Sequence, residues 1–264
     1  MSDDDFGTQS EPPTHPELLD WLAAEFRETG WNMKQLHRLI VTSATWRQSS
    51  FSRPELKERD PYNSWLARQN RLRVEAEIIR DIALSASGLI FHKIGGRSVY
   101  PPQPADLVKL GFQTSLSWPE NQDQNRYRRG IYTFFQRTVP YPMLIEFDAA
   151  DSNAACTRRE RSNTPLQALT LWNDPVFVEC AQHLGARLLK EVPADGDNAV
   201  NVIEKRIRLA YELCFSRPPS KEELQVVGRL YKEAADKDGV QTDLVAAFAV
   251  ARVLLNLDEF ITRE

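Results

Sequence analysis

The side chains of this chain that could do chemistry are mainly carboxylates and arginines. Five acids are candidates for catalysis by a pair of carboxyl groups: Glu75, Glu77, Asp81, Asp148 and Asp151. Hydrolysis of this kind needs two carboxyl groups about 5–9.5 Å apart, and spacing along the chain does not define that distance. The sequence therefore identifies these acids as candidates but does not indicate a reaction.

The arginines near these acids have two alternative roles. Arg137, Arg158 or Arg161 would pair with Glu75 and its neighbours in a buried ion network, because a carboxylate directed at a core needs a cation. Alternatively, guanidinium groups would bind a carboxylated or sulfated ligand bidentately. The candidates for such an anion site are Arg80, Arg137, Arg158, Arg161 and Asn173. The sequence leaves both alternatives open.

Other catalytic and cofactor motifs are missing from the sequence. It contains no GxSxG motif, no P-loop and no GxGxxG. The four histidines lack HxH and HxxxH spacing, and there is neither CxxC nor CxxCH, so we expect no metal site, no haem and no other cofactor. Cys180 and Cys214 lie on apolar helical stripes and should be buried thiols, whereas a disulfide through Cys156 stays open.

The composition indicates a globular protein. The 264 residues are 42% hydrophobic and 27% charged, which is ordinary for such a chain. The net charge of -4 argues against a nucleic-acid partner. No apolar run approaches the roughly 18–20 residues that span a membrane. The N-terminus shows neither the basic nor the apolar region of a signal peptide.

The acids at 75–81 lie on a predicted helix that ends at Gly88. Its apolar face comprises Ile78, Ile79, Ile82, Ala83 and Ala86. Glu75 lies one turn earlier on that face, so we expect it to point at the core. Glu77 and Asp81 are four residues apart at the edge of the face, where like charges repel unless something bridges them.

Residues 158–189 carry the clearest helix signals. Thr164, Pro165 and Gln167 predict an N-cap, a first-turn proline and a capping box. Asp174 and Pro175 start a second helix directly afterwards, which makes a rigid corner. The buried stripe of this second helix is expected to be Phe177, Cys180, Ala181, Leu184 and Leu188.

Two further helices are expected near the N-terminus. Thr14 and Glu17 predict a capping box for the first, and Gly30 ends it. Asn32 caps the second. The side chains expected to face inward are Leu18, Leu19, Leu22 and Phe26 on the first helix and Leu36, Leu39 and Ile40 on the second. Residues 47–61 are expected to form a polar loop.

The middle of the chain carries the strand signals. Residues 91–127 are rich in loop residues, residues 130–138 alternate as a strand does, and residues 143–149 are the expected pairing partner. The surrounding aromatic residues would form either core or a sugar-stacking surface; they are Trp118, Tyr127, Tyr132, Phe134, Phe135 and Tyr141.

The last third is predicted to be helical. One helix covers about 197–214, a capping box of Ser220 and Glu223 opens the next, and an apolar, central helix covers 242–257. We therefore predict a mainly α fold with a small two-stranded β insertion near residues 130–149. Residues 1–13 should be frayed and 14–264 should form one domain, with subdivisions at 14–90, 91–157 and 158–264.

Several of these segments resemble the planctomycete-type PSD1 family, DUF1553. They read RSNTPLQALTLWNDP, HPELLDWLAAEF, WNMKQLHRLIVTSATWRQSS, RRGIYTFFQRT, FDAAD, RPPSKEEL and LLNLDEF. The family is uncharacterised, so the resemblance names no reaction. It implies an upstream DUF1549 domain as partner, with this chain as a C-terminal half. It also implies a periplasmic or extracellular bacterial setting, where such proteins often carry a c-type cytochrome domain.

Two functional hypotheses follow. In the first, the chain is a non-catalytic interaction or scaffold module that packs on the DUF1549 half and exposes a large apolar patch. In the second, it is a polysaccharide-directed enzyme or an acidic-glycan-binding domain. The second hypothesis requires Glu75, Glu77, Asp81 and Asp148 to converge with arginines in an open cleft.

Overall fold

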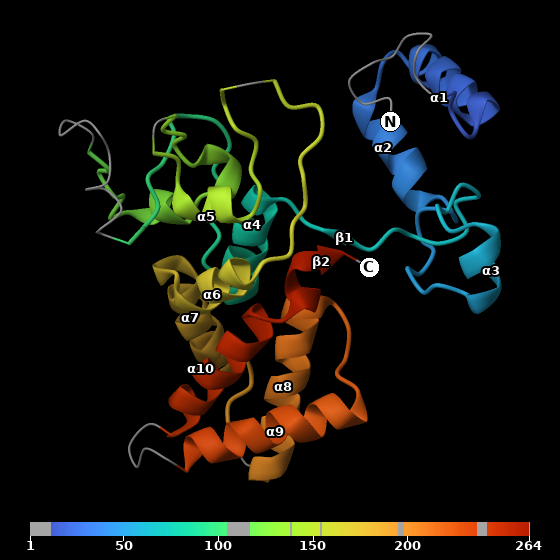
Figure 1. Ribbon diagram of the computed structural model, residues 1–264. Coiled ribbons are helices and arrows are strands. Elements are labelled where there is room, and N and C mark those ends of the chain that lie inside the picture. The colour runs from blue at the N-terminus through green and yellow to red at the C-terminus, as the bar shows by residue number, and fades with distance from the viewer. Residues whose placement is uncertain are drawn as a thin grey trace. The chain divides into compact units, whose positions relative to one another are not determined.

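The computed structural model describes residues 12–104, 117–137, 139–153, 155–194, 198–236 and 242–263. These residues are mainly helical with very little strand, which confirms the predicted fold class (Figure 1). The chain divides into two units, residues 1–73 with 262–264 and residues 74–261. Nearly all of the segment 1–13, expected to be frayed, lies outside the described residues.

The described residues of the first unit form three helices and the two-stranded sheet. Its helices are α1 (Pro16–Glu28), α2 (Met33–Thr42) and α3 (Pro54–Arg59). The sheet pairs β1 (Leu72–Arg73) with β2 (Thr262–Arg263) in antiparallel register. The loop predicted at 47–61 is thus interrupted by a short helix, which Pro54 favours because it occupies the first helical position.

Two predictions about α1 and α2 are confirmed and two are wrong. Gly30 follows α1 with a φ of +70°, and the Asn32 side chain accepts a hydrogen bond from the Gln35 amide. Thr14 does not cap α1, because the helix starts one residue later and His15 occupies the cap position. The expected stripes are less buried than predicted, since neither α1 nor α2 contains a fully buried residue. Leu18 and Leu19 are exposed, and the other five stripe residues are half-buried.

The second unit is a helical domain. Its α-helices are α4 (Ala76–Ser87), α5 (Pro142–Glu146), α6 (Pro165–Asn173), α7 (Pro175–Glu191), α8 (Ala199–Phe215), α9 (Lys221–Ala235) and α10 (Thr242–Leu255). Short 3-10 turns occur at η2 (Gln124–Tyr127), η3 (Gly130–Tyr132) and η4 (Asp258–Ile261).

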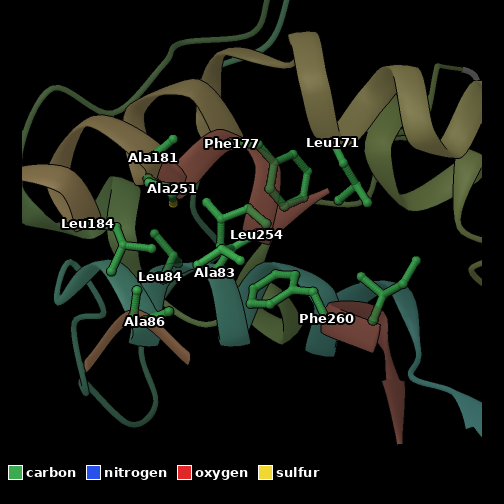
Figure 2. Close-up of a cluster of buried hydrophobic side chains, with 14 of the residues drawn as sticks. Ala83, Leu84, Ala86, Leu171, Phe177, Ala181, Leu184, Ala251, Leu254 and Phe260 are labelled. Atoms are coloured by element: carbon green, nitrogen blue, oxygen red, sulfur yellow. The ribbon is translucent and has the colours of Figure 1, made fainter. Parts of the chain in front are cut away.

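The core of this unit forms around α10, which packs on α7, α9 and α8, while α4 packs on the same α7 (Figure 1). Small residues allow these helices to approach closely. Figure 2 shows the resulting cluster, to which α4, α6, α7, α10 and η4 contribute side chains. The prediction of a central apolar helix near 242–257 is confirmed, because most of the apolar residues of α10 are buried.

The predicted helix starts in this unit follow local side-chain chemistry. Thr164 and Gln167 form the full capping box of α6, and Ser220 and Glu223 form that of α9. The Asp174 carboxylate accepts the Val176 amide at the start of α7. The expected stripe of α7 is buried throughout. The helix predicted from residue 197 begins at Ala199, and Asp197 lies outside the described residues.

The predicted β insertion at 130–149 is wrong. Residues 130–132 form a 3-10 turn, and Thr133 makes only an isolated bridge with Val99. The presumed partner strand is α5 instead, because Pro142 lies at its first turn and pre-sets a helical φ. Alternation in 130–138 therefore does not reflect a strand, because the stretch begins with a 3-10 turn and makes only this isolated bridge. Thr138 lies outside the described residues.

All three cysteines are free thiols. Cys180 is buried and Cys214 partly so, and burial raises the pKa of each thiol to about 12. Cys156 is an exposed free thiol and does not pair with Cys180 or Cys214. Among the described helices, none combines the length and apolarity needed to cross a membrane.

Candidate functional site

Two of the predicted acids meet an arginine at the start of α4. Arg159 binds Glu77 with both terminal nitrogens, at 2.7 and 3.1 Å, and its Nη1 also lies 3.5 Å from Glu75. Arg161 lies 4.0 Å from the other oxygen of Glu75. Glu75 is the N-cap residue and its side chain is 47% exposed, so the expectation that it points at the core is wrong. The helix begins one residue too late to turn Glu75 inward.

The third acid, Asp81, is buried and holds a different segment. Its two oxygens accept hydrogen bonds from the Gly130 amide at 2.6 Å and from Arg129 Nε at 2.7 Å. A Cβ on Gly130 would lie 2.5 Å from the carbonyl oxygen of Glu77, so only glycine fits this approach. Asp81 therefore fastens the 3-10 turn η3 to α4.

The fourth acid, Asp148, belongs to a separate polar group. It follows α5 with a φ of +58°, and one of its oxygens accepts both the amide and the hydroxyl of Ser162, at 2.7 and 2.8 Å. Gln167 in turn donates to the Ser162 hydroxyl and to the Glu146 carbonyl. The hydrogen bonds of Asp148 thus join the end of α5 to the start of α6.

The electrostatics of Glu77 oppose a role as general acid. Burial raises the pKa of Glu77, but the hydrogen bonds and charge of Arg159, with a helix amide, outweigh it and the pKa is lowered overall. A general acid at neutral pH needs a raised pKa so that it keeps its proton. Glu77 is ionised at that pH and acts as the counterion of Arg159.

The predicted anion-binding residues lie in different segments and contact different groups. Arg161 and Arg158 lie in the segment before α6, Arg137 donates to Asn153, and Asn173 is the exposed last residue of α6. Arg80 is buried in α4 and donates from Nη2 to the Arg126 carbonyl at 2.5 Å. The sequence-based candidates missed the two arginines that bind the acids most directly, Arg129 and Arg159, although both stand in visible arginine runs.

A buried polar group next to Arg80 was also missed as a candidate. Asp174 is buried, and burial raises its pKa to about 6, with the Val176 amide and the charge of Arg80 opposing that rise. Tyr141 is fully buried nearby and donates to the Pro102 carbonyl at 2.7 Å. The sequence signal for Asp174 was its role as helix cap, which gave no indication of its burial.

Asp174→Asn is expected to remove a pH-dependent loss of stability. The carboxyl has a pKa near 3.9 in the unfolded chain and about 6 in the folded one, so ionisation between these values favours unfolding. The unaltered chain should therefore lose on the order of 2–3 kcal/mol relative to the variant as pH rises from 4 to 7. Asparagine preserves the N-cap.

Urea unfolding of both proteins at pH 4, 5, 6 and 7 measures this difference. The difference in free energy of unfolding between variant and unaltered chain should grow across that range and then level off. A difference that is constant with pH would contradict the burial of the ionised Asp174.

The candidate acids line neither of two hollows found on the second unit. One, of about 420 Å³, is mostly apolar and lies between α7 and α10, lined by Gln182, His183, Ala186, Leu244, Val245 and Phe248. The other, of about 370 Å³, lies between α8 and α9. Among the described residues, no group of three or more histidine, cysteine or acidic side chains could hold a metal ion.

The aromatic residues near the loop-rich region pack on one another. Trp118 stacks on Tyr141 at 5.6 Å between ring centroids, and Tyr100 contacts both Trp118 and Phe134. The indole of Trp118 donates to the Pro101 carbonyl. Because Tyr141 is fully buried, its ring belongs to the interior and offers no surface for stacking sugars.

In the first unit, unlike the second with its buried apolar core, many large apolar side chains are exposed. Within residues 12–73, all of which are described, the only buried residues are Asp60 and Asn63. The large hydrophobic side chains that are exposed there are Leu18, Leu19, Trp21, Trp31, Met33, Val41, Trp46, Phe51, Tyr62, Trp65 and Leu66. Within this unit the buried side chains are therefore polar, and many of its large apolar side chains are exposed.

Fold and site together define a mainly helical domain whose charged groups largely pair with one another. The family model of PSD1, described as a protein of unknown function (DUF1553), matches residues 1–231, and the chain belongs to this family. Searches for similar curated proteins and similar solved structures found no match.

Proposed function

We propose that the chain is a non-catalytic interaction module whose first unit packs on a partner domain. The observation that carries this proposal is the burial pattern of residues 12–73, where the only two buried residues are polar and no apolar residue is fully buried. Apolar surface gains free energy when it is removed from water, and large exposed apolar patches mark interaction sites. A domain that binds nothing would not be expected to expose so many aromatic and aliphatic side chains.

The partner we propose is a DUF1549-type domain, in the same or a neighbouring chain. The support is the family resemblance of the sequence, in which such a domain lies immediately upstream of the helical hairpin α1–α2. On the same basis we propose a bacterial envelope setting, periplasmic or extracellular, with a c-type cytochrome domain as a further neighbour.

Removal of apolar side chains from α1 is expected to weaken this interaction. Leu18 and Trp21 are both exposed and lie three residues apart, so they share one face of the helix. The double substitution Leu18→Ser and Trp21→Ser should raise the Kd for a purified DUF1549-type domain at least tenfold in isothermal titration calorimetry. Tryptophan is among the residues whose removal costs most at interfaces.

The matched control is Val226→Ser on α9, an exposed apolar residue of the second unit. Its Kd should match that of the unaltered chain. Equal Kd values for the α1 variant and the control would contradict docking through α1, and no binding by the unaltered chain would contradict the proposed partner.

The alternative, a polysaccharide-directed enzyme or acidic-glycan-binding domain, has weaker support. Three of the four candidate acids accept hydrogen bonds from other parts of the chain. Glu77 accepts from Arg159, Asp81 accepts from Gly130 and Arg129, and Asp148 accepts from Ser162. Glu75 and Arg161 remain partly exposed at the surface. A sulfated glycan that bound there would be released by Arg161→Ala and unaffected by substitutions in α1.

A further inference from the structure

A turn in the first unit is built from buried polar side chains. The Asp60 carboxylate accepts the amides of Ser64 and Trp65, at 2.7 and 2.8 Å. The Asn63 side chain accepts the Ala67 amide at 3.0 Å and the Arg68 amide at 3.3 Å, and donates to the Arg68 carbonyl at 2.8 Å. These bonds fix the backbone of residues 60–68, named here the 60–68 turn.

Two glutamines tie the 60–68 turn to the preceding segment. Gln48 donates from its amide side chain to the Leu66 carbonyl at 2.8 Å. Gln69 donates from its side chain to the Trp46 carbonyl at 2.7 Å and from its backbone to the Ser49 carbonyl at 3.1 Å. The C-terminal end of the turn is therefore tied to the preceding segment by polar contacts.

The backbone of the turn carries local strain. Asn63 and Leu66 have φ values of +55° and +51°, in the left-handed region. Asparagine tolerates that region, but a leucine there is strained and persists only where the surroundings impose it. Such strain concentrates at functional sites. The same turn carries the side chains of Tyr62, Trp65 and Leu66, which are exposed at 91, 57 and 38%.

The surroundings of the turn are cationic, and the cations are mostly arginines. Residues 46–73 contain six arginines and one lysine against three acids, of which Asp60 is engaged inside the turn, although the whole chain has a net charge of -4. Arg59 lies over the Trp65 ring at 5.9 Å. Arginine, tryptophan and tyrosine are the residue types that dominate binding energy at protein interfaces, where lysine is depleted.

We propose that Tyr62, Trp65 and Leu66 form a preformed anchor that inserts into an apolar pocket with an acidic rim on a partner protein. This inference rests on the proposed function and names the chemistry of its partner surface. The exposed leucine favours a protein pocket over an acidic polysaccharide, since a sugar chain offers no site to bury it. Preorganisation matters because a fixed turn loses little conformational entropy on binding.

The test compares the anchor with a control residue in binding to a purified DUF1549-type domain. Trp65→Ala and Tyr62→Ala should each raise the Kd at least tenfold, and raising NaCl should weaken binding of the unaltered chain. The control Val226→Ser removes an exposed apolar side chain of the second unit, outside the proposed interaction surface, and should change the Kd less than twofold. Circular dichroism checks that the variants stay folded.

The outcomes separate this inference from the proposed function. If the Leu18→Ser, Trp21→Ser variant lost binding while Trp65→Ala bound fully, the anchor proposal would be wrong and the proposed interaction module would stand. Tighter binding of heparin than of the protein domain, lost in Trp65→Ala, would also overturn it in favour of an acidic polysaccharide. No binding of the domain by the unaltered chain overturns both proposals.

A second measurement needs no partner. The amides of Ser64, Trp65, Ala67 and Arg68 should exchange slowly with solvent in the free chain, because each is hydrogen-bonded to Asp60 or Asn63. Exchange at the rate of an unprotected peptide would show that the turn is not preformed and would overturn the anchor.

Discussion

Gly185→Val is expected to lower the free energy of unfolding by about 3 kcal/mol. Gly185 lies in α7 where it crosses α10, and a Cβ there would meet the Phe248 amide nitrogen at 2.9 Å and the Ala247 carbonyl carbon at 3.1 Å. Both are backbone atoms, which cannot rotate away as a side chain can. Valine would therefore separate two helices of the core, and its larger size adds to the clash.

A second helical glycine provides the control for this result. Gly228 lies in α9, and a Cβ there would meet nothing closer than the Ile207 side chain, at 3.9 Å. Gly228→Ala should stabilise the chain by about 0.5–1 kcal/mol, because alanine loses less backbone entropy in a helix. Urea unfolding of both variants should give shifts of opposite sign. Equal shifts would show that the α7–α10 crossing is not as close as described.

Arg206→Ala is expected to cost a similar amount, about 3 kcal/mol. The buried guanidinium donates to the Tyr231 hydroxyl at 2.7 Å, the Asp243 carboxylate at 2.9 Å and the Val192 carbonyl at 3.0 Å. It thereby joins α8 to α9, to α10 and to the residue that follows α7. Alanine leaves both a cavity and unpaired polar groups.

Substitution of the neighbouring Arg208 is the control that distinguishes the loss of buried contacts from the loss of one positive charge. It lies on the same helix, but among the described residues it forms an ion pair only with Glu204 one turn earlier, and its side chain is half-exposed. Arg208→Ala should cost about 0.3–0.5 kcal/mol, as exposed pairs at this spacing do. Thermal or urea unfolding that shows equal losses for the two arginines would contradict the buried role of Arg206.

The starts of α6, α7 and α9 could be predicted from the sequence because their chemistry is local. The box of Thr164 and Gln167, the cap at Asp174 and the box of Ser220 and Glu223 each involve residues at most three apart. The β insertion failed for the converse reason. Alternation in 130–138 describes one extended segment, but a sheet needs a second strand, and the residues that form one are Leu72–Arg73 and Thr262–Arg263, which lie far apart in the sequence.

The candidate site could be predicted by residue type but not by pairing. The sequence brought out the acids at 75–81 and the arginine run at 158–161, and the structure joins them through Arg159. Which arginine faces which acid depends on the path of residues 91–157, most of which follow no periodic pattern. Similarly, periodicity identified amphipathic helices at 16–42 but could not show that their apolar faces would stay half-buried or exposed within the unit.

The pairing of β1 with β2 has a consequence for how the chain is made. The first unit takes its second strand from residues 262–263, synthesised almost 190 residues after the first. At roughly 5–20 residues per second, a ribosome leaves β1 without its partner for about 10–40 s. During that interval the exposed aromatic side chains of residues 12–73 are available to other proteins. Early capture by the partner, or by a chaperone, would shield them before synthesis ends.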